Sequence, residues 1–142
     1  MTLFRLDSVI YINHTDFGGR ASWGATFGDY PNQDLRGHGT FVASLAVGTQ
    51  YGLATAAKVI AVKVWDKPAE GRISNVIAAF EWIVDQVSKS KKPSVVNLSI
   101  SHAPNQALRK AVSAAIEAGI HFVGSAGNRK ENVNNNFIST SK

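Results

Sequence analysis

The sequence predicts an α/β fold with three layers, in which a mostly parallel sheet carries helices on both faces. Short apolar runs alternate along the chain with longer segments whose apolar residues recur at helical spacing. Strands that alternate with helices in this way pair in parallel through right-handed crossovers. The chain has 142 residues, of which 44% are hydrophobic, so it is long enough to bury a core.

The strands are predicted from short runs rich in Val, Ile and Leu. Such continuous apolar runs are typical of parallel strands that are buried on both faces. Pro93 prevents the preceding helix from continuing into the next strand. The predicted strands span residues 2–6, 59–64, 94–99 and 120–125.

Three helices follow from apolar spacing and from capping residues. Gly37-His-Gly-Thr40 leads into a helix whose apolar face is predicted to hold Phe41, Val42, Leu45 and Ala46. Ser74 is predicted to cap the second helix, and Asn105 to open the third. Gly119 follows the third helix as its C′ residue. The apolar face of the second helix holds Val76, Ile77, Phe80, Ile83, Val84 and Val87, and that of the third holds Leu108, Ala111, Val112, Ala115 and Ile116.

Composition excludes several classes of protein. The chain has no cysteine, which excludes a disulfide framework, a zinc–thiolate site and a cysteine nucleophile. No apolar run approaches the roughly 18 residues of a membrane helix, and the N-terminus carries no apolar signal segment. The net charge of +5 includes Lys89, Lys91 and Lys92, which suit a solvated helix C-terminus. No aromatic residues are interleaved with basic ones, so we expect no nucleic-acid partner and no membrane partner.

Polar residues gather where the predicted strands end, which is where open parallel sheets place their chemistry. Asp7 follows the first strand, Ser99 to His102 follow the third, and Ser125 to Asn128 follow the fourth. His38 stands between two glycines at the start of a helix. A carboxylate, an imidazole and an amide together suggest acyl transfer. Taken singly, each has a plainer interpretation, as a turn or cap for the aspartate, a tight turn for the glycines and an ordinary loop for the amide.

The combined pattern resembles the subtilisin family of serine endopeptidases, in its proteinase K-like fungal branch. The resemblance runs from Asp7 to Asn128 and implies an Asp-His-Ser triad that hydrolyses peptide bonds in proteins. The segments that carry it are Asp7-Ser8, His14-Thr-Asp-Phe-Gly-Gly-Arg-Ala21, Gly37-His-Gly-Thr40, Val95-Val-Asn-Leu-Ser99, Ala118-Gly-Ile120 and Ser125-Ala-Gly-Asn128.

The resemblance implies a role for each matched residue. Asp7 corresponds to the triad acid, His38 to the general base and Asn128 to the oxyanion-hole amide. Two walls hold an extended peptide by its main chain, a mode of binding that depends little on side chains. The implied substrate-binding residues are Gly71 and Ser74 on one wall, Ser99, Ile100 and Ser101 on the other, and Ser125, Ala126 and Gly127 beside the specificity pocket.

The nucleophilic serine of the family has no counterpart in the sequence. The family carries it downstream of the oxyanion asparagine, in a Gly-Thr-Ser-Met-Ala segment, and none of the 14 residues after Asn128 forms that motif. We therefore expect residues 1–131 to form an incomplete, subtilisin-like peptidase domain that is truncated before the catalytic serine, with a coil tail over 132–142. Alone, such a fragment is expected to be inactive, and whether it is an enzyme stays open.

Smaller departures lie beside the expected site. Val9 replaces the glycine of the Asp-Ser-Gly motif, and a β-branched residue there costs at least ~1–2 kcal/mol if the position needs a positive φ. Ser101-His102 stands where the family usually has two glycines, which would narrow the approach of a peptide.

Two other functions compete with the truncated protease. One is a non-catalytic pseudo-protease that binds extended peptides. The other is a nucleotide-binding domain, which is disfavoured because Gly37-His-Gly-Thr-Phe-Val42 lacks the third glycine of the dinucleotide fingerprint and no Walker-A segment exists. We expect no cofactor and no catalytic metal, and a monomer if the chain folds. The parent family is extracellular; the location of a fragment without a signal peptide cannot be predicted.

Overall fold

The computed structural model describes residues 1–66, 71–100, 104–128, 130 and 132. Within these residues five strands form one parallel sheet with the order β2-β3-β1-β4-β5. The elements are β1 (Thr2–Asp7), the 3-10 turn η1 (Thr15–Phe17), β2 (Ala21–Thr26), α1 (His38–Val47), β3 (Lys58–Lys63), α2 (Ile73–Ser90), β4 (Ser94–Leu98), α3 (Gln106–Glu117) and β5 (His121–Gly124).

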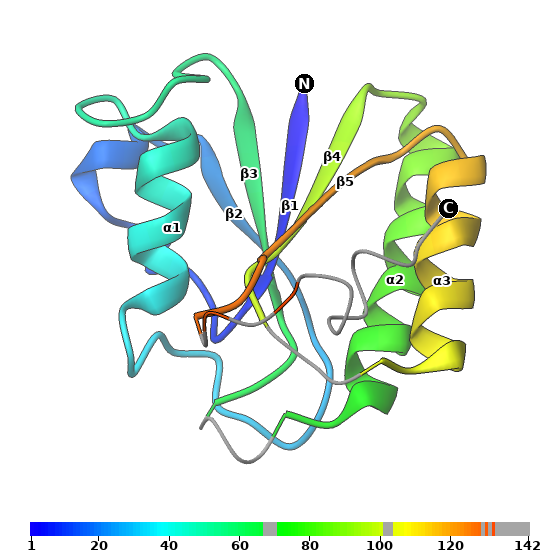
Figure 1. The fold of residues 1–142 in the computed structure, drawn as a ribbon. Helices are drawn as coiled ribbons and strands as arrows, with labels where there is room; N and C mark the ends of the chain where they lie inside the picture. The colour runs from blue at the N-terminus through cyan, green and yellow to red at the C-terminus, as the bar shows by residue number, and fades with distance from the viewer. Residues whose placement is uncertain (67–70, 101–103, 129, 131, 133–142) are drawn as a thin grey trace.

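Helices cover both faces of the sheet, as predicted. Figure 1 shows α1 on one side and the pair α2 and α3 on the other. The larger core lies under α2 and α3 and takes Phe4 and Leu6 from β1. The smaller core lies under α1 and takes Leu3 from the same strand. Because successive side chains of a strand alternate between faces, Arg5 and Asp7 belong with Leu3 on the α1 face.

The four predicted strands are all present, but a fifth strand, β2, was not predicted. It pairs with β3 at one edge of the sheet, and its register shifts between Trp23 and Ala25. Gly24 lies at this bulge, where an added Cβ would come within 2.6 Å of the Ile60 side chain. Ser22 and the bulge break the apolar pattern by which a strand is recognised.

The helix α1 corrects a prediction. Phe41 and Leu45, expected on its buried face, are 62% and 47% exposed. The buried residues are Gly39, Ala43 and Val47, which form a face of small side chains. A Cβ at Gly39 would overlap the carbonyl oxygen of Val9, so the absence of a side chain lets α1 lie directly on the loop that follows β1.

Of the two predicted N-cap residues, one is confirmed and the other is wrong. Asn105 occupies the N-cap of α3, where its side-chain oxygen accepts a hydrogen bond from the Leu108 N–H at 3.0 Å. Gly119 follows this helix with φ of +82°, as predicted for C′. The prediction for Ser74 was wrong: Arg72 occupies the N-cap of α2, and Ser74 lies exposed in the first turn.

The two caps give a matched test of the fold. Asn105→Ala should lower the free energy of unfolding by about 1 kcal/mol, because it leaves a backbone N–H of α3 without its acceptor. Ser74→Ala should change it by less than about 0.5 kcal/mol. Urea unfolding of both variants beside the parent chain measures the difference, and equal losses would contradict the assignment of the caps.

Candidate active site

Asp7 is the last residue of β1, and its side chain is fully buried. Its Oδ1 accepts a hydrogen bond from the Ser8 N–H at 2.7 Å. Its Oδ2 accepts a short, charged hydrogen bond from the Arg5 guanidinium, which is also fully buried. A carboxylate removed from water must keep its hydrogen bonds, and these two donors supply part of them.

His38 is the first residue of α1 and lies against Asp7. Its Nδ1 is 2.8 Å from Oδ1 and 2.9 Å from Oδ2 of the carboxylate. With Nδ1 committed to the acid, Nε2 is the nitrogen left to exchange a proton with another group. The His38 side chain is 42% exposed, so that exchange can take place at the surface.

The loop before α1 is tied down on both sides of His38. Gly37 has φ of +74°, and its N–H donates to Asp34 Oδ1 at 2.8 Å. On the other side, the Thr40 hydroxyl donates to Asp34 and accepts from the Tyr11 N–H at 2.8 Å. The imidazole is therefore held by the loop after β1 as well as by its own helix.

The electrostatic surroundings raise the pKa of His38 above 6.5. The hydrogen bond to Asp7 is the largest cause, and the negative charges of Asp7 and Asp34 add to it. Partial burial and the positive charge of Arg5 act in the opposite direction. Burial likewise lowers the pKa of Arg5 below its usual value, against the pull of Asp7.

Trp65 lies directly beyond β3, and the sequence analysis did not find it. Its ring meets the His38 ring edge-on, with 6.1 Å between centroids, and the Arg36 guanidinium lies 5.7 Å from its centroid. A Cβ added at Gly71 would lie 3.3 Å from the Trp65 Cβ. Trp65 thus lies between His38 and Gly71 of the predicted substrate wall, and its position at the carboxyl end of a strand was the available signal.

The opposite predicted wall follows β4. The Ser99 hydroxyl donates to Asn97 Oδ1 at 3.3 Å, and that oxygen also accepts from Arg5 at 2.5 Å. Ile100 packs against the core under α2 and α3. Ser101 lies outside the described residues.

The segment after β5 begins at the carboxyl ends of the parallel strands, on the same side of the sheet as Asp7. Its first residue, Ser125, donates its N–H to the Leu98 carbonyl at 3.2 Å and accepts from the Gly127 N–H on its hydroxyl at 3.0 Å. Gly127 has φ of +90°, and Ala126 and Asn128 are exposed. The structure brings Asp7 and His38 into contact, and Asn128 follows a strand that ends on the same side of the sheet as β1.

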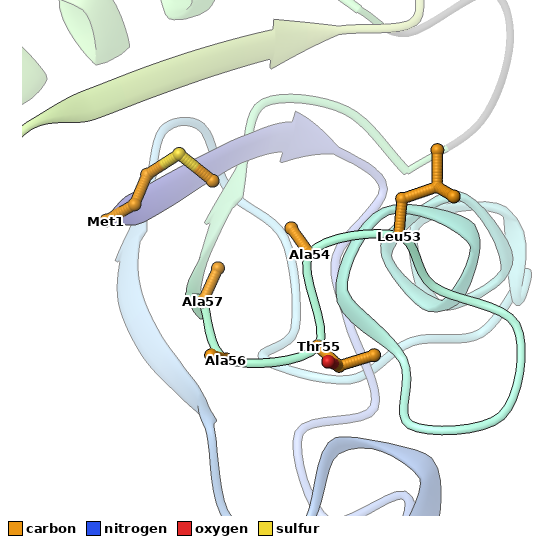
Figure 2. Close-up of a pocket in the computed structure, with 6 residues that line it drawn as sticks. All are labelled: Met1, Leu53, Ala54, Thr55, Ala56 and Ala57. Carbon is orange, nitrogen blue, oxygen red and sulfur yellow. The ribbon is translucent and has the colours of Figure 1, made fainter.

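A pocket of about 290 Å³ lies at the opposite end of the strands, where β1 and β3 begin (Figure 2). It carries no titratable side chain that could take part in chemistry. The residues that line it are Met1, Leu53, Ala54, Thr55, Ala56 and Ala57. Within the described ranges no three His, Asp or Glu side chains converge as a metal site requires.

Comparison with known proteins decides the family. The model of the Subtilase family matches residues 6–140. The chain belongs to the subtilase family. The predicted resemblance is thereby confirmed, and so is the subtilisin-like fold class.

Two curated fungal relatives illustrate the match. The chain is 41% identical over 134 residues to Subtilisin-like protease 3 of Pseudogymnoascus destructans, covering 92% of this chain and 33% of the relative. It is 42% identical over 135 residues to Subtilisin-like protease 6 of Trichophyton schoenleinii, covering 90% and 33%. This subtilase chain therefore spans about a third of the length of these relatives.

Solved structures agree. A cold adapted subtilisin-like serine proteinase superposes with a TM-score of 0.90 and 34% identity, covering 99% of this chain and 51% of that one. The psychrophilic protease S41 superposes with a TM-score of 0.82 and 27% identity. Among the described residues of this subtilase, no helix is long and apolar enough to cross a membrane.

The Asp7–His38 pair predicts how the stability of this subtilase depends on pH. The pKa of His38 is higher in the folded state than in the unfolded state. The pair therefore stabilises the folded state fully below pH 6.5, and this stabilisation is lost as the pH rises through the folded-state pKa of His38. Urea unfolding from about pH 5 to about pH 9 should therefore show His38→Gln losing stability relative to the parent mainly at the acidic end. The same substitution in an Asp7→Asn background should lose this trend, and a deficit that grows with pH would contradict the pairing.

Proposed function

We propose that this chain supplies the acid, the base and the oxyanion amide of a subtilase active site that hydrolyses peptide bonds in proteins. One observation carries the proposal: the buried Asp7 carboxylate holds Nδ1 of a half-exposed His38 at 2.8 Å. A buried acid fixes the tautomer of the imidazole and stabilises its protonated form, which a general base needs during acyl transfer.

The proposed reaction needs a serine that the 142 residues do not supply in the family motif. Nε2 of His38 takes the proton of that serine as its oxygen attacks the peptide carbonyl, and then delivers the proton to the leaving amine. Asp7 keeps its negative charge throughout. The amide of Asn128 donates to the oxyanion that forms.

The proposed substrate is a protein segment in extended conformation, bound through its main chain. We assign Ser99, Ile100 and Ser101 to one wall and the region of Gly71 and Ser74 to the other, with residues 125–127 beside the specificity pocket. The closeness of Gly71 to Trp65, whose ring meets the His38 ring edge-on, supports a wall beside His38. Main-chain recognition favours broad substrates, as suits an enzyme acting outside the cell.

Exposed apolar surface supports a larger complete domain. Phe41 and Leu45 on α1 are largely exposed, and Val123 on the edge strand β5 is 52% exposed. Large apolar side chains gathered on an open helix face and an open strand edge are typical of surfaces that another part of a domain covers. This chain covers 51% of the cold adapted relative, so a domain of that relative's size has enough additional residues to cover these surfaces.

A chimera tests the proposed function. The chain should replace the matching segment of Subtilisin-like protease 3 of Pseudogymnoascus destructans and yield a peptidase. His38→Ala should then reduce turnover by roughly 10⁶ and Asp7→Asn by roughly 10⁴, as the loss of the corresponding groups does in serine proteases. Lys89→Ala, which removes an exposed ion pair with Asp85, should leave peptide hydrolysis unchanged.

The chain alone gives the complementary result. A fluorophosphonate probe, which reacts with an activated serine, should not label it. Labelling that disappears in His38→Ala would show a nucleophile within these 142 residues and would overturn the need for an external serine. An inert chimera beside a chain that binds extended peptides would instead favour the pseudo-protease.

A further inference from the structure

Arg5 is a charged residue in the middle of the central strand, and the proposed reaction does not use it. Strands β3 and β4 flank it on either side, and its side chain is fully buried. Its guanidinium donates to Asp7 Oδ2, to Asn97 Oδ1 at 2.5 Å and, at 3.4 Å and 3.5 Å, to the carbonyls of Asn97 and Leu6. It is thus the cation in direct contact with the carboxylate that holds His38.

This position is unfavourable for a cation unless the charge has a partner. Moving a guanidinium out of water is costly, and an apolar side chain at the same place would avoid that cost. Within the described part of the chain, Arg5 Nε is buried without a hydrogen-bond partner. Packing alone therefore gives no reason for an arginine here, whereas the carboxylate of Asp7 does.

We propose that Arg5 is a positioning residue that acts on His38 through Asp7, by binding the carboxylate that the two share and offsetting its negative charge. The two oxygens of the Asp7 carboxylate have different partners. Oδ2 receives the Arg5 hydrogen bond, Oδ1 receives the Ser8 N–H, and His38 Nδ1 lies within 2.9 Å of both oxygens. The inference rests on the proposed role of His38 as a base.

Offsetting the charge has a definite consequence. An imidazolium beside a lone carboxylate is strongly stabilised, so a histidine paired in that way stays protonated at higher pH and is less available as a base. Arg5 weakens this stabilisation, and its charge acts to lower the pKa of His38. Among the described residues, the other charged groups near His38 are Asp34, which raises that pKa, and Arg36, which lies over Trp65.

The test is an NMR titration of the His38 imidazole in the full 142-residue chain. Arg5→Met should move the midpoint to higher pH, because it removes the opposing charge while filling similar apolar volume. Arg20→Met is the matched control: Arg20 donates to the Val47 and Ala57 carbonyls rather than to Asp7 or His38, so its loss should leave the midpoint in place. An unchanged midpoint in a folded Arg5→Met chain would overturn the proposal.

A second pair of variants keeps the test decisive if Arg5→Met fails to fold. Arg5→Lys and Arg5→Gln both lose the forked guanidinium, but only the lysine keeps the charge. The midpoint of His38 should be higher in Arg5→Gln than in Arg5→Lys. Equal midpoints would show that the charge does not act on His38. In the active chimera, the acidic limb of the pH–kcat profile should move in the same direction as the midpoint.

Asp7→Asn separates failure of this inference from failure of the proposed function. It should lower the His38 midpoint, because the largest cause of the raised pKa is removed. If Asp7→Asn lowers the midpoint and the Arg5 variants do not move it, the acid–base pair stands and the role of Arg5 is wrong. If neither moves it, the pair itself is absent in solution and the proposed function fails.

Discussion

The structure depends on one buried carboxylate. Asp7 lies at the carboxyl end of the central strand, fully removed from water, and three groups bind it: the Ser8 N–H, the Arg5 guanidinium and His38 Nδ1. These donors come from β1 itself, from the turn that follows it and from the first residue of α1. A buried charge is tolerated only while such partners surround it, so the strand, the turn and the helix are constrained to meet at this point.

The turn after Asp7 contains a strained backbone conformation. Val9 has φ of +129°, so the strain expected for a β-branched residue at the glycine position of the motif is present. Such a conformation costs about 1–3 kcal/mol. The Val9 side chain is also fully buried in the core under α1, and that burial contributes about 1.5–3 kcal/mol of stability. The two effects are of similar size, which explains how a valine is tolerated at the point where Gly39 of α1 packs against the Val9 backbone.

Sequence reasoning found what is local and periodic. Four strands and the cap at Asn105 followed from apolar runs and capping chemistry, and the rule that parallel strands end on one side of the sheet singled out Asp7. The pairing of Asp7 with His38 was implied by the resemblance to the family. It misjudged α1 because periodicity identifies an apolar stripe without showing which face is covered, and here Gly39 and Ala43 face the sheet while Phe41 faces outward. It missed Arg5 because a charged residue in a strand gives no sign of burial, which here depends on Ala61 and Asn97 in the two neighbouring strands, far away in the sequence.

The components of the site differ in what they require from the rest of a domain. The pair of Asp7 and His38 is built from β1 and α1, and Asp34, Thr40 and Tyr11 hold the backbone beside His38. All of these contacts lie within the first 40 residues, so none of them involves the nucleophilic serine of the family motif. Asn128, the proposed oxyanion amide, instead follows β5, which lies at the edge of the described sheet and pairs there with β4. The proposed acid and base therefore touch each other within the described residues, whereas the position of the proposed oxyanion amide depends on an edge strand, where unpaired backbone groups can accept a further strand.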